Sequence, residues 1–98
     1  MPMFYEQAAQ LLLFVTRAGL VIRPGVDCRA VLLRLAELMH ASLRDARGLT
    51  HFGTATWFLD DLEKHKLVTC QKQDRNKILA MLGTGIANLH SAHVHNAR

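Results

Sequence analysis

Apolar residues recur every three or four positions at the start of the chain. This spacing from Met3 to Ala18 is typical of an α-helix with one wide apolar face. Gly19 follows as a C-terminal stop. The next stretch, Leu20 to Val26, cannot continue the helix, because it contains two adjacent β-branched residues and Pro24. The sequence therefore predicts a first helix that ends in a non-helical connection.

A second helix is predicted to begin after Asp27, which is a good N-cap residue, and to run to about Ala41. Its positions are mostly apolar, so we expect it to be central to the core. The tetrapeptide that starts at Ser42 has the form of a capping box. It predicts a short helix from Leu43 to Arg47.

Gly48 breaks this short helix, and Thr50 is a candidate cap for a longer one from His51 to about His65. A short helix, a turn containing glycine and a longer helix together form a helix-turn-helix pattern. The longer helix buries one apolar side, while its other side is mostly polar.

A β-hairpin is predicted after the longer helix. Leu67 to Gln71 forms the first strand, Lys72 to Asn76 the charged tip and Lys77 to Leu82 the return strand. The alternative is that Lys77 to Leu82 is helical, because leucine, alanine and methionine are good helix formers. Thr84 to His95 is predicted to be the last helix.

The predicted fold is thus mainly α with a small β-hairpin, in the order of a winged helix-turn-helix. The 98 residues make one domain, 1–98. Within it, residues 1–19 are an N-terminal dimerisation helix, residues 27–82 the winged-helix core and residues 84–98 a C-terminal helix.

Half of the residues are hydrophobic and only 20% are charged, which is more apolar side chain than a small monomer usually hides. We expect a homodimer with the N- and C-terminal helices in its interface. The alternative is ordinary packing of these helices within one chain. The expected interface residues are Phe4, Ala8, Leu11, Leu12, Val15, Ile86 and Leu89.

Twelve lysine and arginine residues outnumber eight acidic residues, for a formal charge of +4. This balance favours a polyanion such as double-stranded DNA as a partner. Cys28 and Cys70 are far apart in the sequence, and we expect both to be reduced and mostly buried, which suits a cytoplasmic protein. The longest apolar stretch, Leu11 to Val15, is too short to span a membrane, so we expect no membrane partner.

The segment FLDDLEKHKLV resembles the end of the recognition helix in winged-helix repressors of the MarR type. Leu62, Lys64, Leu67 and Val68 match that pattern, whereas Lys66 replaces its usual glycine. Further on, the dipeptide Asp-Arg at 74–75 is similar to the family's wing tip, and the segment 82–85 to its entry into the final helix. PadR-like and ArsR-like repressors share the same hairpin arrangement.

Two groups of side chains are the candidates for DNA contact. Polar residues of the longer helix would face the major groove, and basic residues of the hairpin and the short helix would contact phosphates. The wing arginine, Arg75, would enter the minor groove. The candidates are His51, Thr54, Thr56, Trp57, Arg44, Arg47, Lys72, Arg75 and Lys77.

Asp60 and Asp61 oppose deep insertion of the longer helix into DNA, because carboxylates repel phosphates. We expect these residues to orient an arginine of the wing or of the core helix. For Trp57 the alternative is packing in the core, and for the threonines it is helix capping.

No catalytic motif is present, so an enzyme is not expected. His90, His93 and His95 lack a nearby cysteine or carboxylate that would complete a metal site. No metal or cofactor is expected, and no polar constellation points to an effector.

The leading hypothesis is a dimeric, sequence-specific DNA-binding regulator, most simply a repressor. Its recognition helix would lie in the major groove and its wing on the backbone or in the minor groove. The alternative is a winged-helix module that binds another protein and not DNA. The acidic pair on the longer helix favours this alternative, and the basic hairpin disfavours it.

Overall fold

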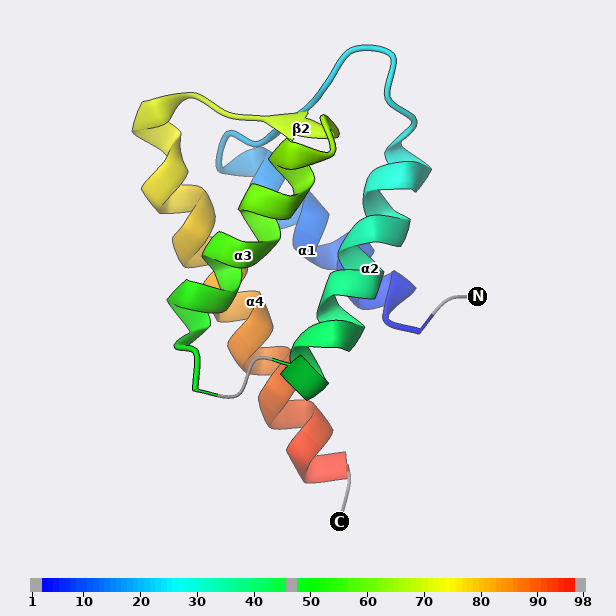
Figure 1. The fold of residues 1–98 in the computed structure, drawn as a ribbon, viewed down its shortest axis with the longest axis vertical. Coiled ribbons are helices and arrows are strands. Elements are labelled where there is room, and N and C mark those ends of the chain that lie inside the picture. Colours follow the sequence, from blue (N-terminus) through cyan, green and yellow to red (C-terminus); the bar gives the residue numbers. More distant parts are fainter. Residues whose placement is uncertain (1–2, 46–47, 97–98) are drawn as a thin grey trace.

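The computed structural model describes residues 3–45 and 48–96, and for residues 93–96 the backbone only. Within these residues the chain is mainly α-helical, with one small antiparallel sheet (Figure 1). The elements follow the order α1 (Tyr5–Arg17), β1 (Val21–Ile22), α2 (Cys28–Asp45), α3 (His51–Lys64), β2 (Val68–Thr69), the 3-10 turn η1 (Lys72–Asp74) and α4 (Arg75–Asn96).

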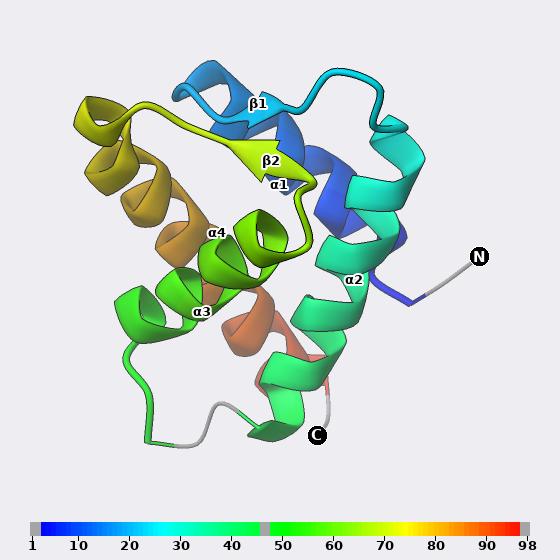
Figure 2. The ribbon, with the colours of Figure 1, turned by 45° about the horizontal axis from the view of Figure 1, so that its top comes forward.

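The two strands come from distant segments and not from a hairpin. Val21 pairs with Thr69 and Ile22 with Val68, in antiparallel register. The sheet therefore ties the segment after α1 to the segment after α3, as Figure 2 shows. The strand predicted at 67–71 exists in its middle, but its partner is an earlier segment whose signal was a pair of β-branched residues.

The predicted return strand at residues 77–82 is wrong, because these residues form the first turns of α4. A strand would place Ile78, Ala80 and Leu82 on one face, yet Ala80 is exposed and its neighbour Leu79 is buried. The helical alternative is the one that forms. The final helix accordingly begins at Arg75 and not at Thr84. Its buried positions recur at helical spacing: Ile78, Leu79, Leu82, Ile86 and Leu89.

Residues 28–45 form one helix where the sequence predicts two. The side chain of Asp27 accepts a hydrogen bond from the backbone N–H two residues on, at 2.9 Å, as expected of an N-cap. Ser42 does not start a new helix: it is buried inside α2, and its hydroxyl donates to the carbonyl of Met39 at 2.8 Å. The predicted short helix at 43–47 is therefore the last turn of α2 as far as Asp45.

Interactions between nearby residues account for the start and the end of α3. The Thr50 side chain accepts a hydrogen bond from the backbone N–H of Gly53 at 2.9 Å, which confirms the predicted cap. At the other end Lys66 adopts a left-handed backbone with a φ of 57°, and the N–H of Leu67 donates to the carbonyl of Leu62. Lys66 thus takes the conformation that glycine usually adopts after a helix.

The core lies where α3 packs against α4, with α1 and α2 closing it from the other sides (Figures 1 and 2). Phe58 and Leu59 of α3 are fully buried there. The helices approach closely at Gly83, where a Cβ atom would lie 3.6 Å from the carbonyl oxygen of His51. The C-terminal helix therefore belongs to the same core as α2 and α3.

The side chains expected in a dimer interface pack inside the single chain. Six of them are buried, and Phe4 is partly buried against the same core. This is the alternative considered for the N-terminal helix, packing within one chain. The exposed side of α1 carries other apolar residues, Leu13 and Phe14. The six buried side chains are Ala8, Leu11, Leu12, Val15, Ile86 and Leu89.

Two glycines of α4 provide a test of the helix that replaces the predicted strand. Gly83→Ala adds a Cβ at ordinary contact distance, so the helix propensity of alanine should raise the free energy of unfolding by about 0.5–1 kcal/mol. Gly85→Ala places its Cβ 2.5 Å from Leu11 Cδ1, so it should be the less stable of the two variants. Urea denaturation of both variants measures this. A loss of stability in Gly83→Ala would contradict a continuous helix there.

Candidate nucleic-acid interface

The two candidate threonines of α3 use their hydroxyl groups within the helix. Thr54 is buried, and its hydroxyl donates to the carbonyl of Thr50 at 3.1 Å. The hydroxyl of Thr56 donates to the carbonyl of Phe52 at 3.0 Å, from a half-exposed position. Burial removes Thr54 from any DNA contact in this conformation, which corrects its place among the candidates. Thr56 remains on the surface of α3.

The aromatic candidates of α3 differ in exposure. His51 is exposed, and its ring meets that of His90 edge-on with centroids 5.8 Å apart. Trp57 is half-buried and packs edge-on against Phe58 with centroids 5.5 Å apart. Packing on the core, the alternative considered for Trp57, therefore accounts for part of its surface. The exposed Phe52 precedes it by more than one helical turn.

Two arginines are held by carboxylates of α3. Arg34 of α2 donates from Nε and Nη2 to the two carboxylate oxygens of Asp61, each at 2.7 Å. Arg75, at the start of α4, donates to Glu63 and to Asp60, also at 2.7 Å each. These forked contacts confirm the prediction that the paired aspartates orient an arginine. They join α3 to the helix before it and to the helix after it.

The electrostatics of these contacts agree with their geometry. Hydrogen bonding to Arg34 holds the pKa of Asp61 below its ordinary value of 3.8, and this outweighs the opposing effect of burial. Hydrogen bonding to Glu63 is the main cause that raises the pKa of Arg75. Arg75 is therefore not the free cation of a wing tip, which corrects the prediction that it enters the minor groove.

The exposed face of α3 is consequently mixed and not basic. Asp60 lies near its centre with a side chain 59% exposed, and Glu63 lies one turn along. Phe52 adds apolar surface at one end, and Lys64 adds a positive charge at the other. Because Arg75 neutralises only part of the negative charge, this face lacks the positive potential that phosphates attract.

Free positive charges gather instead at the end of the molecule where α3 stops. The turn of α3 into β2 brings Lys64 and Lys66 there, and the backbone N–H of Arg23 donates to the carbonyl of Leu67 at 3.0 Å. The turn η1 supplies Lys72, and the first turn of α4 supplies Lys77. We call this set the basic end: Arg23, Lys64, Lys66, Lys72 and Lys77.

All five side chains of the basic end are on exposed residues, and within the described part of the chain none pairs with a carboxylate. They come from four neighbouring segments around the small sheet, at the top of Figure 1 and turned forward in Figure 2. The nearby Asp60 and Glu63 are engaged by Arg75. The candidates Lys72 and Lys77 thus lie on segments at this end of the molecule, which also carries three cations that the sequence analysis did not select and the carboxylate of Asp74 in η1.

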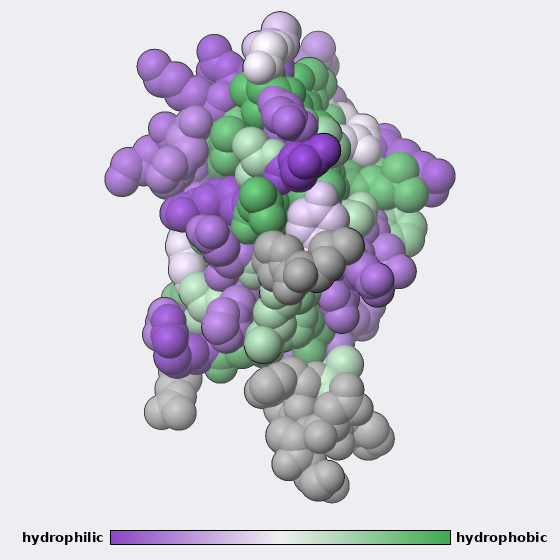
Figure 3. Space-filling model, turned by 90° about the vertical axis from the view of Figure 1, so that its right-hand side faces the viewer, coloured by the Kyte–Doolittle hydropathy of each residue, from purple (hydrophilic) through white to green (hydrophobic). Residues whose placement is uncertain are grey.

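The other basic candidates lie elsewhere. Arg44 is exposed near the end of α2, at the far end of α3 from the basic end, with its Nε 3.5 Å from a carboxylate oxygen of Asp45. Arg47 lies outside the residues that the structure describes. Figure 3 shows hydrophobic residues interspersed with hydrophilic ones on the side of the molecule that includes α2.

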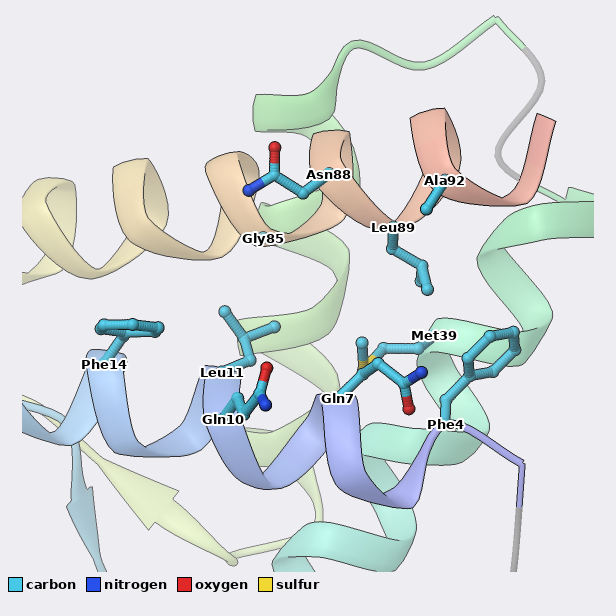
Figure 4. Close-up of a pocket in the computed structure, with 10 residues that line it drawn as sticks. All are labelled: Phe4, Gln7, Gln10, Leu11, Phe14, Met39, Gly85, Asn88, Leu89 and Ala92. Atoms are coloured by element: carbon cyan, nitrogen blue, oxygen red, sulfur yellow. The ribbon is translucent and has the colours of Figure 1, made fainter. Parts of the chain in front are cut away.

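A groove of about 320 Å³ lies between α1 and α4 (Figure 4). Leu11 and Phe14 line it from α1, Phe4 from the residue before α1, and Leu89 from α4. None of the lining residues is charged, and three of them have carboxamide side chains: Gln7, Gln10 and Asn88. The groove is therefore apolar with a neutral polar rim, and it lies away from the basic end.

Few of the other described side chains are arranged for metal binding or thiol chemistry. No group of three or more histidine, cysteine or acidic residues among them is arranged to hold a metal ion. Both cysteines are free, but Cys28 is exposed, which corrects the expectation that both are mostly buried. Cys70 is half-buried, and burial raises the pKa of its thiol. Ser42 and His90 form a hydrogen bond of 2.9 Å between α2 and α4.

No helix among residues 3–45 and 48–96 has the length and apolarity required to cross a membrane.

Comparisons of the chain with protein-family models, with curated proteins and with solved structures find no match. The assessment of function therefore depends on the geometry described above. The sequence analysis missed Arg34, Arg23 and the two lysines near the end of α3 as residues of interest. Arg34 carried a signal, since an arginine on the core helix was one of the two partners expected for the aspartates.

The fork at Arg75 should contribute to stability. Arg75→Ala leaves Asp60 and Glu63 unpaired and removes a link between α3 and α4. We expect it to lower the free energy of unfolding by about 1–2 kcal/mol, measured by urea denaturation followed by Trp57 fluorescence. Lys77→Ala, which removes an exposed cation from the same helical turn, should change it by less than about 0.5 kcal/mol. Equal stabilities of the two variants would show that the fork contributes nothing.

The pair between Arg34 and Asp61 should appear in acid unfolding. Because the pKa of Asp61 is lowered in the folded chain, its contribution to stability is complete above the ordinary value of 3.8 and is lost as pH falls through the lowered value. Asp61→Asn should therefore be less stable than the wild type near neutral pH, with a smaller loss of stability in acid. Denaturation at pH values from about 6 to 2 tests this.

Asp45→Asn provides the control for that titration, since Asp45 is exposed and lies at the far end of α2. It should follow the pH dependence of the wild type. If Asp61→Asn instead ran parallel to the wild type over the whole range, the proposed coupling would be absent.

Proposed function

We propose that this protein binds double-stranded DNA through its basic end and acts as a small transcriptional regulator. The observation that carries the proposal is a set of five exposed cations on the segments around the small sheet, none of which pairs with a carboxylate among the described residues, in a chain with a net charge of +4. Cations placed in this way neutralise phosphates of a duplex backbone and release its counterions.

The order of elements supports the same proposal. A strand, two helices and a second strand that pairs with the first make up β1, α2, α3 and β2. This arrangement is compatible with the core of a winged helix, whose recognition helix would be α3. A MarR-type relationship, as the end of α3 suggests, belongs to this proposal.

The acidic face of α3 shapes how DNA would be bound. Asp60 and Glu63 would repel phosphates, so the duplex backbone would lie on the basic end and not along the whole of α3. Base edges would be within reach of the half-exposed Thr56 and the exposed Lys64, near the middle and the end of the helix. Contacts to the backbone would then set affinity, and these few side chains would set sequence preference.

A protein partner on α3 is the second candidate function. The exposed Phe52, the half-buried Trp57 and the acidic Asp60 give this face a mixed apolar character, which is common in protein interfaces and unfavourable next to phosphates. A module of this kind would leave the basic end free of DNA.

Binding to random-sequence duplex DNA at several salt concentrations distinguishes the two candidates. If all five cations contact phosphates, the slope of log K against log salt should approach about −4.5, at about 0.9 per contact. Lys72→Gln should reduce the magnitude of the slope by about 0.9. Arg44→Gln removes one charge of the same sign at the opposite end of α3 and should leave the slope unchanged.

Selection of preferred sites from the same duplex pool tests regulation by sequence. Enrichment of a common motif is expected of a transcriptional regulator. A folded protein that shows no binding at low salt would overturn the proposal and favour the protein-binding alternative. Equal slopes for the Lys72 and Arg44 variants would show that the basic end is not the surface that contacts DNA.

A further inference from the structure

One side of α1 is a stripe of exposed residues that the chain itself leaves uncovered. Glu6, Gln10, Leu13 and Arg17 follow one another at intervals of three or four positions, so they share this side of the helix. All four are exposed, with Leu13 at 52%, and the neighbouring Phe14 is 47% exposed. The opposite side of α1 faces the core. The stripe therefore presents apolar surface to solvent on the side of α1 opposite the buried Ala8, Leu11, Leu12 and Val15.

The charges of the stripe stand at its two ends. Glu6 lies in the first turn of α1 and Arg17 in the last. Among the described residues neither forms an ion pair within the chain. The apolar pair and Gln10 lie between them. The helix thus offers a negative end, an uncharged middle and a positive end along one face.

Such a stripe complements a second copy of itself. In an antiparallel arrangement with a two-fold axis near the middle of α1, Glu6 of one copy lies opposite Arg17 of its partner. By the same symmetry Gln10 lies opposite the partner's Leu13. A parallel arrangement would instead bring like charges together at both ends. The charge pattern therefore selects one orientation.

We propose that a second copy of this chain docks on the stripe of α1 in this antiparallel arrangement, as an isologous dimer. The contact removes Leu13 and Phe14 of both copies from water and forms two ion pairs at its rim. It also lets two molecules of charge +4 meet where each is neutral overall. This surface differs from the buried residues that the sequence analysis assigned to the interface, and it does not depend on DNA binding.

The dimer should be weak and dependent on concentration, because one helix stripe buries less than the about 1,200–2,000 Å² of a stable interface. Sedimentation equilibrium from micromolar to millimolar protein should show the mass rise from 11.0 kDa towards twice that value. A mass that stays at 11.0 kDa throughout would overturn the proposal.

Charge reversal tests the orientation. Glu6→Arg and Arg17→Glu should each weaken self-association by about tenfold or more, because each sets like charges against one another. An equimolar mixture of the two variants should recover the affinity of the wild type, since every pair in the mixed dimer is again opposite in sign. Circular dichroism confirms that each variant is folded. A mixture that associates no better than its components would contradict the antiparallel pairing.

Leu13→Ser tests the apolar middle and should weaken the dimer by about tenfold. Leu49→Ser is the matched control, because Leu49 is 50% exposed but lies before α3 and away from the stripe. An effect of Leu49→Ser equal to that of Leu13→Ser would place the self-contact elsewhere and overturn the proposal.

Discussion

The packing of α3 against α4 is the contact on which the rest of the structure depends. Phe58 and Leu59 fill it from α3, and a regular stripe of aliphatic side chains fills it from α4. Gly83 lies where the two helices meet, and the hydrogen bonds of Arg75 to Glu63 and Asp60 hold the start of α4 against α3. α1 and α2 pack against each other and against α4 and α3, and so close the core around this contact.

The same contact determines the chemistry of the surface. Asp60 and Glu63 hold Arg75, and Asp61 holds Arg34, so the carboxylates of α3 serve the tertiary structure first. A helix that carries these carboxylates cannot also present a strongly positive face. The positive potential therefore lies where α3 ends and the chain turns into the sheet. The helix that was expected to read DNA is therefore not the part of the molecule with the strongest positive charge. That charge lies at the basic end.

Features that depend on residues a few positions away were predictable from the sequence. Features that depend on partners distant in the sequence were not. The cap residues Asp27 and Thr50 and the stop at Gly19 act within a few positions, and each is found as expected. The segment 77–82 suits both a strand and a helix, and its burial against α3 decides between them. The aspartates required a distant arginine, which the sequence could name as a type of partner but not as Arg34.

The charges of this small chain are divided between surfaces with different requirements. The basic end concentrates unpaired cations of one sign, which favours a polyanion and disfavours a second copy. The exposed stripe of α1 contains one charge of each sign at its two ends, which favours a second copy in one orientation. In the proposed dimer, Leu13 and Phe14 of α1 are covered while the basic end remains free. Self-association and polyanion binding need not compete, because they depend on different helices.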